Sequence, residues 1–300
     1  MPQNQARWAD KRILFVSGKG GVGKSLVAAA IAQEQARAGR KVLLVEIGDT
    51  SYYKDFWGLP AVSHEPIPLK QGFDLALWSG ESCLREYVLH YLKLEKLYHL
   101  FFENKVMRSL INVAPGLNEI AILGKITSGI RRVGPPLNYD LIVVDSYATG
   151  HAMALLQAPK GMMEAIKFGP MGHHSREMEA VVQNPKLTGY IVVTLLEEMP
   201  VVETLEFNEQ LKREMGVEAD VVGNKFIEEP ASLEDLDKMS QQNTGGLGDF
   251  AKYLKSIGER QAEFLGKLKS LSKNVSVVPL IFSNDPSQLV AGAEEALRQA

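Results

Sequence analysis

Short apolar runs alternate along the chain with longer stretches of helical spacing. Lys11–Ser17 is an apolar run with β-branched and aromatic residues that ends at a glycine, which is typical of a buried strand. Ser25–Ala38 is alanine-rich, holds neither glycine nor proline and stops at Gly39, so it predicts a helix. Lys41–Glu46 predicts a second buried strand. A strand, a glycine loop, a helix and a strand form a βαβ unit, which implies parallel strands.

The same alternation continues to the end of the chain. Further strands are predicted at 73–78, 139–145, 190–195, 219–224 and 275–280, and helices at 81–92, 96–113, 116–132, 200–215, 250–271 and 288–300. This order predicts an α/β fold over 1–300, in one domain, with a doubly wound, mostly parallel sheet flanked by helices. We expect a helical subregion near 81–132, a short helical segment near 160–183 and a mobile loop at 228–249.

Gly18–Ser25 (GKGGVGKS) fits the pattern G-x-x-x-x-G-K-[ST] between a predicted strand and a predicted helix. Glycines let backbone N–H groups point inward at phosphate oxygens, and the helix N-terminus adds partial positive charge. Lys24 can then bridge the β- and γ-phosphates, and the Ser25 hydroxyl can ligate Mg²⁺. The pattern predicts a P-loop NTPase fold that binds ATP and Mg²⁺ through Gly18, Gly20, Gly21, Val22, Gly23, Lys24, Ser25 and Leu26.

Two segments resemble a known group of ATPases. Because of the additional Lys19, KGGVGKS resembles the deviant Walker A motif of the superfamily that includes MinD, ParA, nitrogenase iron protein and ArsA. Asp145–Pro159 (DSYATGHAMALLQAP) resembles the D-T-A-P-T-G-H-x-L-R-x-L-x-x-P segment of ArsA, the arsenite-pump ATPase, and of the guided-entry ATPase that delivers tail-anchored membrane proteins. Looser similarities in family order extend the resemblance to roughly 11–300; they lie at 114–119, 184–188, 203–204, 222–225 and 278–280.

This resemblance implies a homodimeric, Mg·ATP-dependent ATPase in which Lys19 of one subunit reaches the partner's nucleotide. Asp145 would support Mg²⁺ through a bound water, and Thr149–Gly150 would form a flexible turn that senses the γ-phosphate. Asn224 and the loop after Pro279 would recognise adenine. The conformational cycle would energise an anion (arsenite-like) transporter or carry a hydrophobic membrane-protein client.

The chain departs from the family where the attacking water is positioned. The family's second strand usually continues into S-T-D-P-A-H, and its aspartate acts on that water. In the segment VLLVEIGDT, Gly48 stands at the aspartate position, with Glu46 two residues before it and Asp49 one residue after it. We expect Asp49 to position the water, whereas Glu46 would contact Mg²⁺-bound water or Lys24. Both acids stay candidates.

Two further departures concern the client and metal chemistry of the family. Only 25 residues separate Pro159 from Pro185, in a region that is longer in the guided-entry ATPases and forms much of their client groove. Its methionines suit either an adaptable apolar surface or core packing: Met162, Met163, Met171 and Met178. Cys83 is the only cysteine, so neither a Cys-x-x-Cys zinc clamp nor an arsenite-sensing cysteine set can form.

Charge and hydropathy narrow the function classes. With 33 basic and 36 acidic residues the net charge is −3, which argues against a dedicated nucleic-acid binder. Neither a membrane-spanning run of 18 apolar residues nor a secretory leader is evident, so we expect a cytoplasmic protein without direct membrane insertion.

Two alternative functions remain open. A MinD- or ParA-like spatial regulator would use a basic surface, for which Lys125, Arg131 and Arg132 are a thin candidate. The C-terminal stretch 288–300 carries an acidic pair and a single arginine, which disfavours anionic lipid. A nucleotide-gated binding module with little turnover would follow from the departure at Gly48.

Overall fold

The computed structural model describes residues 8–92, 116–165, 170–228 and 246–299, together with 235, 238, 240 and 241. The strands in these residues are β1 (Ile13–Gly18), β2 (Val42–Ile47), β3 (Ile67–Pro68), β4 (Asp74–Trp78), β5 (Leu141–Asp145), β6 (Thr188–Leu195), β7 (Asp220–Phe226) and β8 (Val275–Pro279). They form one sheet in the order β3-β4-β2-β5-β1-β6-β7-β8. Neighbouring strands run parallel except β3, which is antiparallel to β4.

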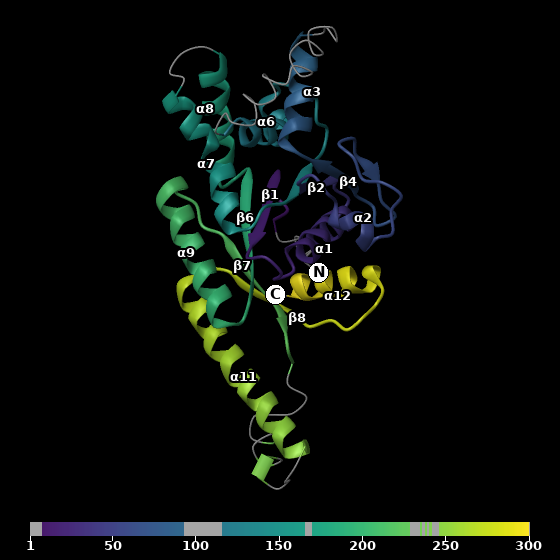
Figure 1. Cartoon of the computed structure of the whole chain (residues 1–300), viewed down its shortest axis with the longest axis vertical. Coiled ribbons are helices and arrows are strands. Elements are labelled where there is room, and N and C mark those ends of the chain that lie inside the picture. Colours follow the sequence, from purple (N-terminus) through teal and green to yellow (C-terminus); the bar gives the residue numbers. More distant parts are fainter. Residues whose placement is uncertain are drawn as a thin grey trace, which may run out of the picture.

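Helices cover both faces of this sheet (Figure 1). They are α1 (Lys24–Arg37), α2 (Tyr52–Phe56), α3 (Gly80–Leu92), α6 (Leu117–Arg131), α7 (Thr149–Ala165), α8 (Pro170–Val182), α9 (Glu198–Met215), α11 (Gly246–Leu271) and α12 (Pro286–Gln299). Helices α1, α2 and α12 share a buried cluster with one face of the sheet, and α6 to α9 share another cluster with the opposite face. Helices α3, α6 and α8 gather at the upper end of the molecule, whereas α11 projects at the lower end (Figure 1).

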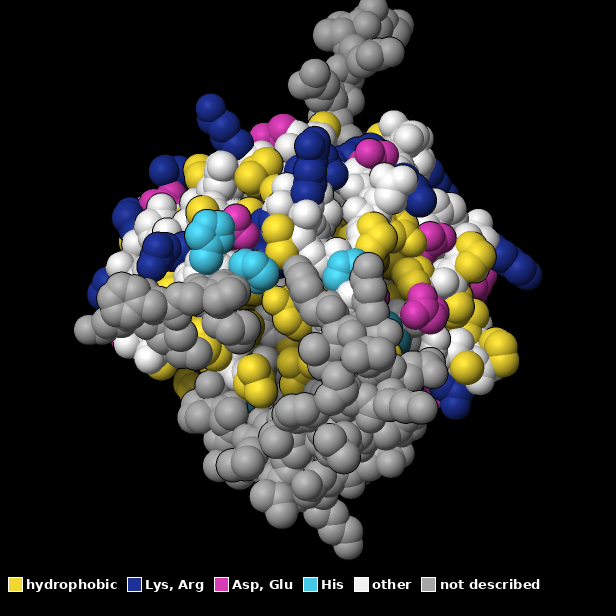
Figure 2. Space-filling view, turned by 90° about the horizontal axis from the view of Figure 1, so that it is seen from above, with side chains coloured by type: hydrophobic (Ala, Val, Ile, Leu, Met, Phe, Trp, Pro, Cys, Tyr) yellow, Lys and Arg dark blue, Asp and Glu magenta, His cyan; other side chains and the backbone are white. Residues whose placement is uncertain are grey.

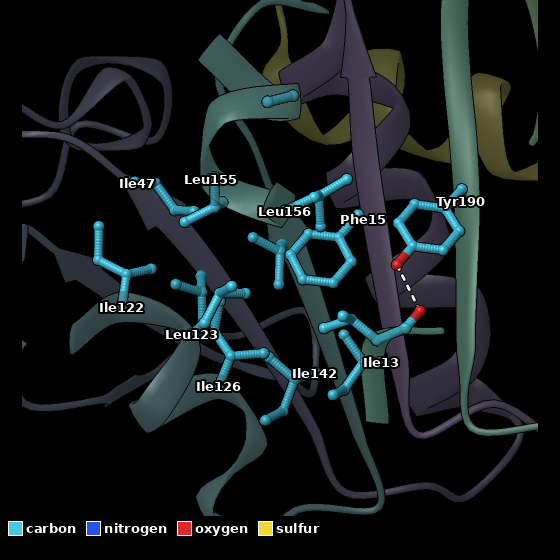
Figure 3. Close-up of a cluster of buried hydrophobic side chains, with 14 of the residues drawn as sticks. Ile13, Phe15, Ile47, Ile122, Leu123, Ile126, Ile142, Leu155, Leu156 and Tyr190 are labelled. Carbon is cyan, nitrogen blue, oxygen red and sulfur yellow. Dashed lines mark hydrogen bonds between the residues drawn. The ribbon is translucent and has the colours of Figure 1, made fainter. Parts of the chain in front are cut away.

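The core follows from the apolar strands at the centre of the sheet. Every residue of β1, β2 and β5 is buried, because helices cover both faces, and such strands are near-continuous apolar runs. Successive side chains point to opposite faces, so Ile13 and Phe15 join one cluster, and Leu14 and Val16 join the other. Figure 3 shows Phe15 and Ile13 in one cluster with side chains of α6, such as Leu123, and of α7, such as Leu156.

The structure confirms the predicted fold class and places most elements within a few residues of their predicted bounds. The helix predicted at 96–113 lies outside the described residues. Two short elements, α2 and β3, were not expected from the sequence, because five and two residues are too few to show a period. Helices α7 and α8 occupy the region near 160–183. The division into one domain stays a prediction.

Two expectations about loops are corrected. Thr149–Gly150 opens α7 instead of forming a separate turn, because the apolar residues that follow it, among them Leu155 and Leu156, bury against the sheet as a helix. The predicted loop at 228–249 extends too far, since α11 already begins at Gly246. A helical glycine costs only about 1 kcal/mol relative to alanine, and Gly248 is buried.

Candidate functional site

The loop from Gly18 to Ser25 joins β1 to α1 at the carboxyl edge of the central strands, where α/β folds bind their ligands. Two of its glycines are required by close neighbours. A Cβ atom on Gly18 would lie 2.1 Å from the carbonyl oxygen of Val193, and one on Gly23 would lie 2.2 Å from the side-chain nitrogen of Asn224. A larger residue at Gly18 would displace the backbone of β6, and one at Gly23 would displace the Asn224 side chain.

The remainder of the loop is open and presents a cation. A Cβ atom on Gly20 or Gly21 would meet nothing within 4 Å, so the backbone there is accessible to a ligand. The Lys24 ammonium bonds to the carbonyl oxygen of Lys19 at 3.2 Å. Burial lowers the pKa of Lys24, and the nearby Asp145 carboxylate opposes that shift. An open backbone curve with a half-buried ammonium fits the phosphates of a nucleotide.

Asp145 lies beside this loop at the end of β5 and is 6% exposed. The hydroxyl groups of Ser25 and Tyr53 interact with its carboxylate. Burial raises the pKa of Asp145 to about 6, with Glu46 adding to the shift and the two hydroxyl groups and Lys24 opposing it. A carboxylate next to the Ser25 hydroxyl is the type of oxygen donor set that Mg²⁺ prefers. The residues present therefore fit the metal.

The raised pKa of Asp145 predicts a pH-dependent stability of the nucleotide-free protein. Because the folded-state pKa of Asp145 (about 6) exceeds its ordinary value of 3.8, ionising Asp145 destabilises the folded state as pH rises from about 4 through 6. We expect Asp145→Asn to increase the free energy of unfolding at pH 7.5 by roughly 1–3 kcal/mol, and by less at pH 5. Urea denaturation at both values measures this; a gain independent of pH would contradict it.

Glu46 and Asp49, the two candidate acids, occupy different environments. Glu46 is 7% exposed, and its carboxylate accepts hydrogen bonds from the Ser51 hydroxyl and the Tyr52 backbone N–H, both at 2.6 Å. Ser51 is the N-cap of α2, so Glu46 stabilises the start of that helix. Burial raises the pKa of Glu46, which these hydrogen bonds partly oppose. Asp49 is exposed on the loop between β2 and α2.

This difference predicts separate effects of the two conservative substitutions. Asp49→Asn should lower kcat about 100-fold and leave ATP affinity nearly unchanged, which indicates an interaction made mainly in the transition state. Glu46→Gln should be milder or weaken the Mg²⁺ dependence, because its carboxylate is engaged by α2. Steady-state phosphate release and nucleotide titration measure both. If Asp49→Asn left kcat unchanged and Glu46→Gln lowered it strongly, Glu46 and not Asp49 would position the attacking water.

Lys19 points toward α9 in this chain. Its ammonium forms an ion pair with the Glu203 carboxylate at 2.5 Å, with the two side chains 38% and 32% exposed. The sequence singled out Lys19 as a residue that reaches a partner subunit, and it placed Glu203 only as a family similarity. The position of Glu203 opposite Lys19 depends on the packing of α9 against β6 and α7, which no local pattern reveals.

The predicted adenine-binding residues lie at the ends of β7 and β8. Asn224 is 2% exposed and donates to the carbonyl oxygen of Val22 at 2.8 Å. Lys225 has a left-handed backbone (φ 56°), and its ammonium lies 3.3 Å from the carbonyl oxygen of Gly21. Pro279 ends β8, directly before a residue that pairs with β7. A cleft of about 810 Å³, bounded by β7 and α11, adjoins them. Its size suits a nucleoside.

Other residues that the sequence singled out do not join this site. The side chains of Lys125 and Arg131 are only 8% and 3% exposed, which removes them from the basic surface that DNA binding would need. Met178 belongs to a core cluster and is 3% exposed, and the partly buried Met162 packs against that cluster. Both positions favour core packing for these two methionines. His151 is exposed, with its ring edge-on to Tyr147.

The doubly wound sheet with a glycine loop, Lys24 and Asp145 at one edge defines a P-loop ATPase. Residues 11–169 match the family model described as anion-transporting ATPase. The chain is 33% identical over 247 residues to ATPase BagA of Mycobacterium tuberculosis, covering 77% of this chain and 69% of the relative. The chain therefore belongs to the anion-transporting ATPase family and is an ATPase.

Less similar relatives are named either as arsenical pump-driving ATPases or as ASNA1 homologues. A putative arsenical pump-driving ATPase of Halobacterium salinarum is 29% identical over 235 residues, with 73% of this chain and 36% of the relative covered. ATPase ASNA1 homolog 2 of Paramecium tetraurelia is 24% identical over 153 residues, with 51% of this chain and 46% of the relative covered. Both support the resemblance found in the sequence.

Proposed function

We propose that the protein hydrolyses Mg·ATP as a cytoplasmic homodimer and couples hydrolysis to a conformational cycle. The observation that carries this proposal is the convergence of Lys24, Ser25 and Asp145 on an open glycine backbone at one edge of the sheet. Lys24 would hold the β- and γ-phosphates, Ser25 would hold the metal directly and Asp145 through a bound water, and Asp49 would orient the attacking water. When bound, Mg²⁺ neutralises charge on the phosphates. Asn224 and the loop after Pro279 contact the base.

Lys19 is the residue through which we propose that two subunits meet. Its side chain starts at the rim of the phosphate loop and ends on the surface of α9, where the Glu203 ion pair holds it in the isolated chain. ATP would recruit Lys19 to the partner's phosphates, because an anionic nucleotide competes for the same ammonium. Hydrolysis removes the γ-phosphate and relaxes the dimer. ATP thereby drives closure, and hydrolysis drives opening.

The closing dimer would either energise an anion transporter or carry a hydrophobic client. A small apolar cavity of about 40 Å³ lies between α3, α6 and α8, with Leu84, Ile120 and Met178 among its lining residues. Figure 2 looks onto this end of the molecule and shows hydrophobic side chains among histidines and charged residues. This cavity is far smaller than an ordinary ligand pocket, so a client at this end of the molecule would have to separate α3 from α8.

Direct insertion into a membrane is no part of the proposal, and nucleic acid is not an expected partner. None of the helices within the described residues has the length and hydropathy to cross a bilayer. The membrane partner would therefore be a separate transporter or the client itself.

A trap variant tests the proposal. Asp145→Asn should bind ATP, release phosphate far more slowly than the wild type and keep the dimer closed. Wild-type phosphate release, small-angle scattering with ATP and recovery of bound proteins on the trapped dimer give three independent measurements. Lys24→Ala, which should not bind ATP, serves as the nucleotide-free control. A wild type that stays monomeric with ATP would contradict the dimer, and negligible turnover would favour the nucleotide-gated binding module.

A further inference from the structure

Tyr53 is a buried tyrosine that contacts both proposed metal-holding residues. It lies in α2 with a side chain that is 0% exposed, and its ring stacks on Trp57 with centroids 4.9 Å apart. Its hydroxyl donates to the backbone oxygen of Ser25 at 2.8 Å. The same hydroxyl interacts with the Asp145 carboxylate. One phenol thus lies between the first turn of α1 and the end of β5.

The helix that carries Tyr53 is itself fixed on the side of the active-site loop. Glu46 accepts hydrogen bonds from Ser51 and Tyr52 at the start of α2, directly before Tyr53. Trp57 and Phe73 continue the aromatic packing behind it. These contacts leave the phenol little freedom, so the position of its hydroxyl is set before any ligand binds.

We propose that Tyr53 is a positioning residue of the magnesium site, an inference that rests on the proposed function. Its hydroxyl donates its one proton to the Ser25 backbone oxygen and lies beside the Asp145 carboxylate, so it fixes the first turn of α1 relative to the end of β5. Mg²⁺ demands near-ideal octahedral geometry, so a small displacement of either residue lowers affinity. Groups that hydrogen-bond to metal-supporting carboxylates typically change metal affinity 10- to 100-fold when removed. A purely packing role would be fulfilled equally well by phenylalanine.

Tyr190 offers a matched control for deletion of the hydroxyl. It lies in β6 and is 5% exposed, and its hydroxyl also donates to a backbone oxygen, that of Val182, at 2.6 Å. Its ring stacks on Phe15, in the cluster on the sheet face opposite α1 and α2 (Figure 3). Tyr190→Phe therefore removes the same atom from a hydrogen bond of another buried tyrosine, on the opposite face of the sheet.

The test measures Mn²⁺ binding to the full chain in the presence of ADP by electron paramagnetic resonance, and nucleotide binding without metal by calorimetry. We expect Tyr53→Phe to weaken Mn²⁺ binding about 10-fold and to leave metal-free nucleotide binding unchanged. Tyr190→Phe should match the wild type in both measurements, and the two variants should lose similar thermal stability.

Wild-type Mn²⁺ affinity in Tyr53→Phe would overturn the assignment and leave the proposed function intact. An equal loss in Tyr190→Phe would also overturn it, because the effect would then belong to the fold as a whole. A wild type that binds ADP without retaining Mn²⁺ would instead overturn the magnesium-dependent function, and this inference with it.

Discussion

Lys24→Ala is expected to reduce ATP affinity at least about 100-fold and to abolish turnover. The Lys24 ammonium is half-buried beside Asp145, and burial already lowers its pKa, so it gains most from an anionic ligand. Charge-assisted hydrogen bonds contribute about 1.5–3 kcal/mol each, and the lysine can make one to each of two phosphates. Calorimetric titration with ATP measures the loss.

Lys41→Ala provides the matched control for the removal of a lysine. Lys41 is exposed at the start of β2, at the opposite edge of the sheet, and its ammonium lies over the Tyr139 ring. It should bind ATP like the wild type. If Lys24→Ala also bound and hydrolysed ATP normally, the assignment of the phosphate loop would be wrong.

The second large effect is expected from Lys19→Ala, which should bind ATP but lose ATP-dependent closure and most turnover. In the isolated chain Lys19 contacts Glu203, so removing its ammonium leaves the phosphate loop of the same subunit in place. What is lost is the contact to the partner's nucleotide. Small-angle scattering with a non-hydrolysable ATP analogue would show a wild-type dimer and a monomeric variant.

Glu203→Gln should favour ATP-dependent closure of the dimer, whereas Lys19→Ala should abolish it. An ion pair between half-exposed groups contributes up to about 1 kcal/mol. Its removal frees Lys19, so closure should require up to about fivefold less analogue. If Glu203→Gln closed only at a higher concentration of the analogue, Glu203 would support the closed dimer. The inference that Glu203 holds Lys19 back from the partner subunit would then be wrong.

The sequence predicted the parts of the site that follow from local patterns. The glycine loop, Lys24 and Asp145 belong to contiguous segments with a buried strand before or after them, and the structure brings those segments together at one edge of the sheet. Parallel neighbours align their carboxyl ends, so this meeting point follows from topology. For the same reason Asn224, at the end of β7, lies close to the loop.

The contacts that the sequence could not reveal join segments far apart in the chain. Tyr53 lies in a helix of five residues, too short to display a hydrophobic period, and its partners are Ser25 and Asp145. In the sequence, Lys125 is only a thin candidate for the basic surface of a DNA-binding alternative. In the structure its ammonium pairs with Glu86, so it lies inward. Such pairings become visible only once the helices are packed.

Helix α11 is attached to the sheet near one end, and its other end lies far from that attachment. The Gln261 side chain bonds to both backbone groups of Ile227, three residues after Asn224, and Leu268 is buried below it. The 15 residues from Gln261 back to Gly246 span about 23 Å at the helical rise of 1.5 Å per residue. A rotation of about 10° at the base would sweep the tip through about 4 Å. With adenine bound as proposed, ångström-scale changes beside it would become displacements of several ångströms at the exposed Leu247 and Phe250.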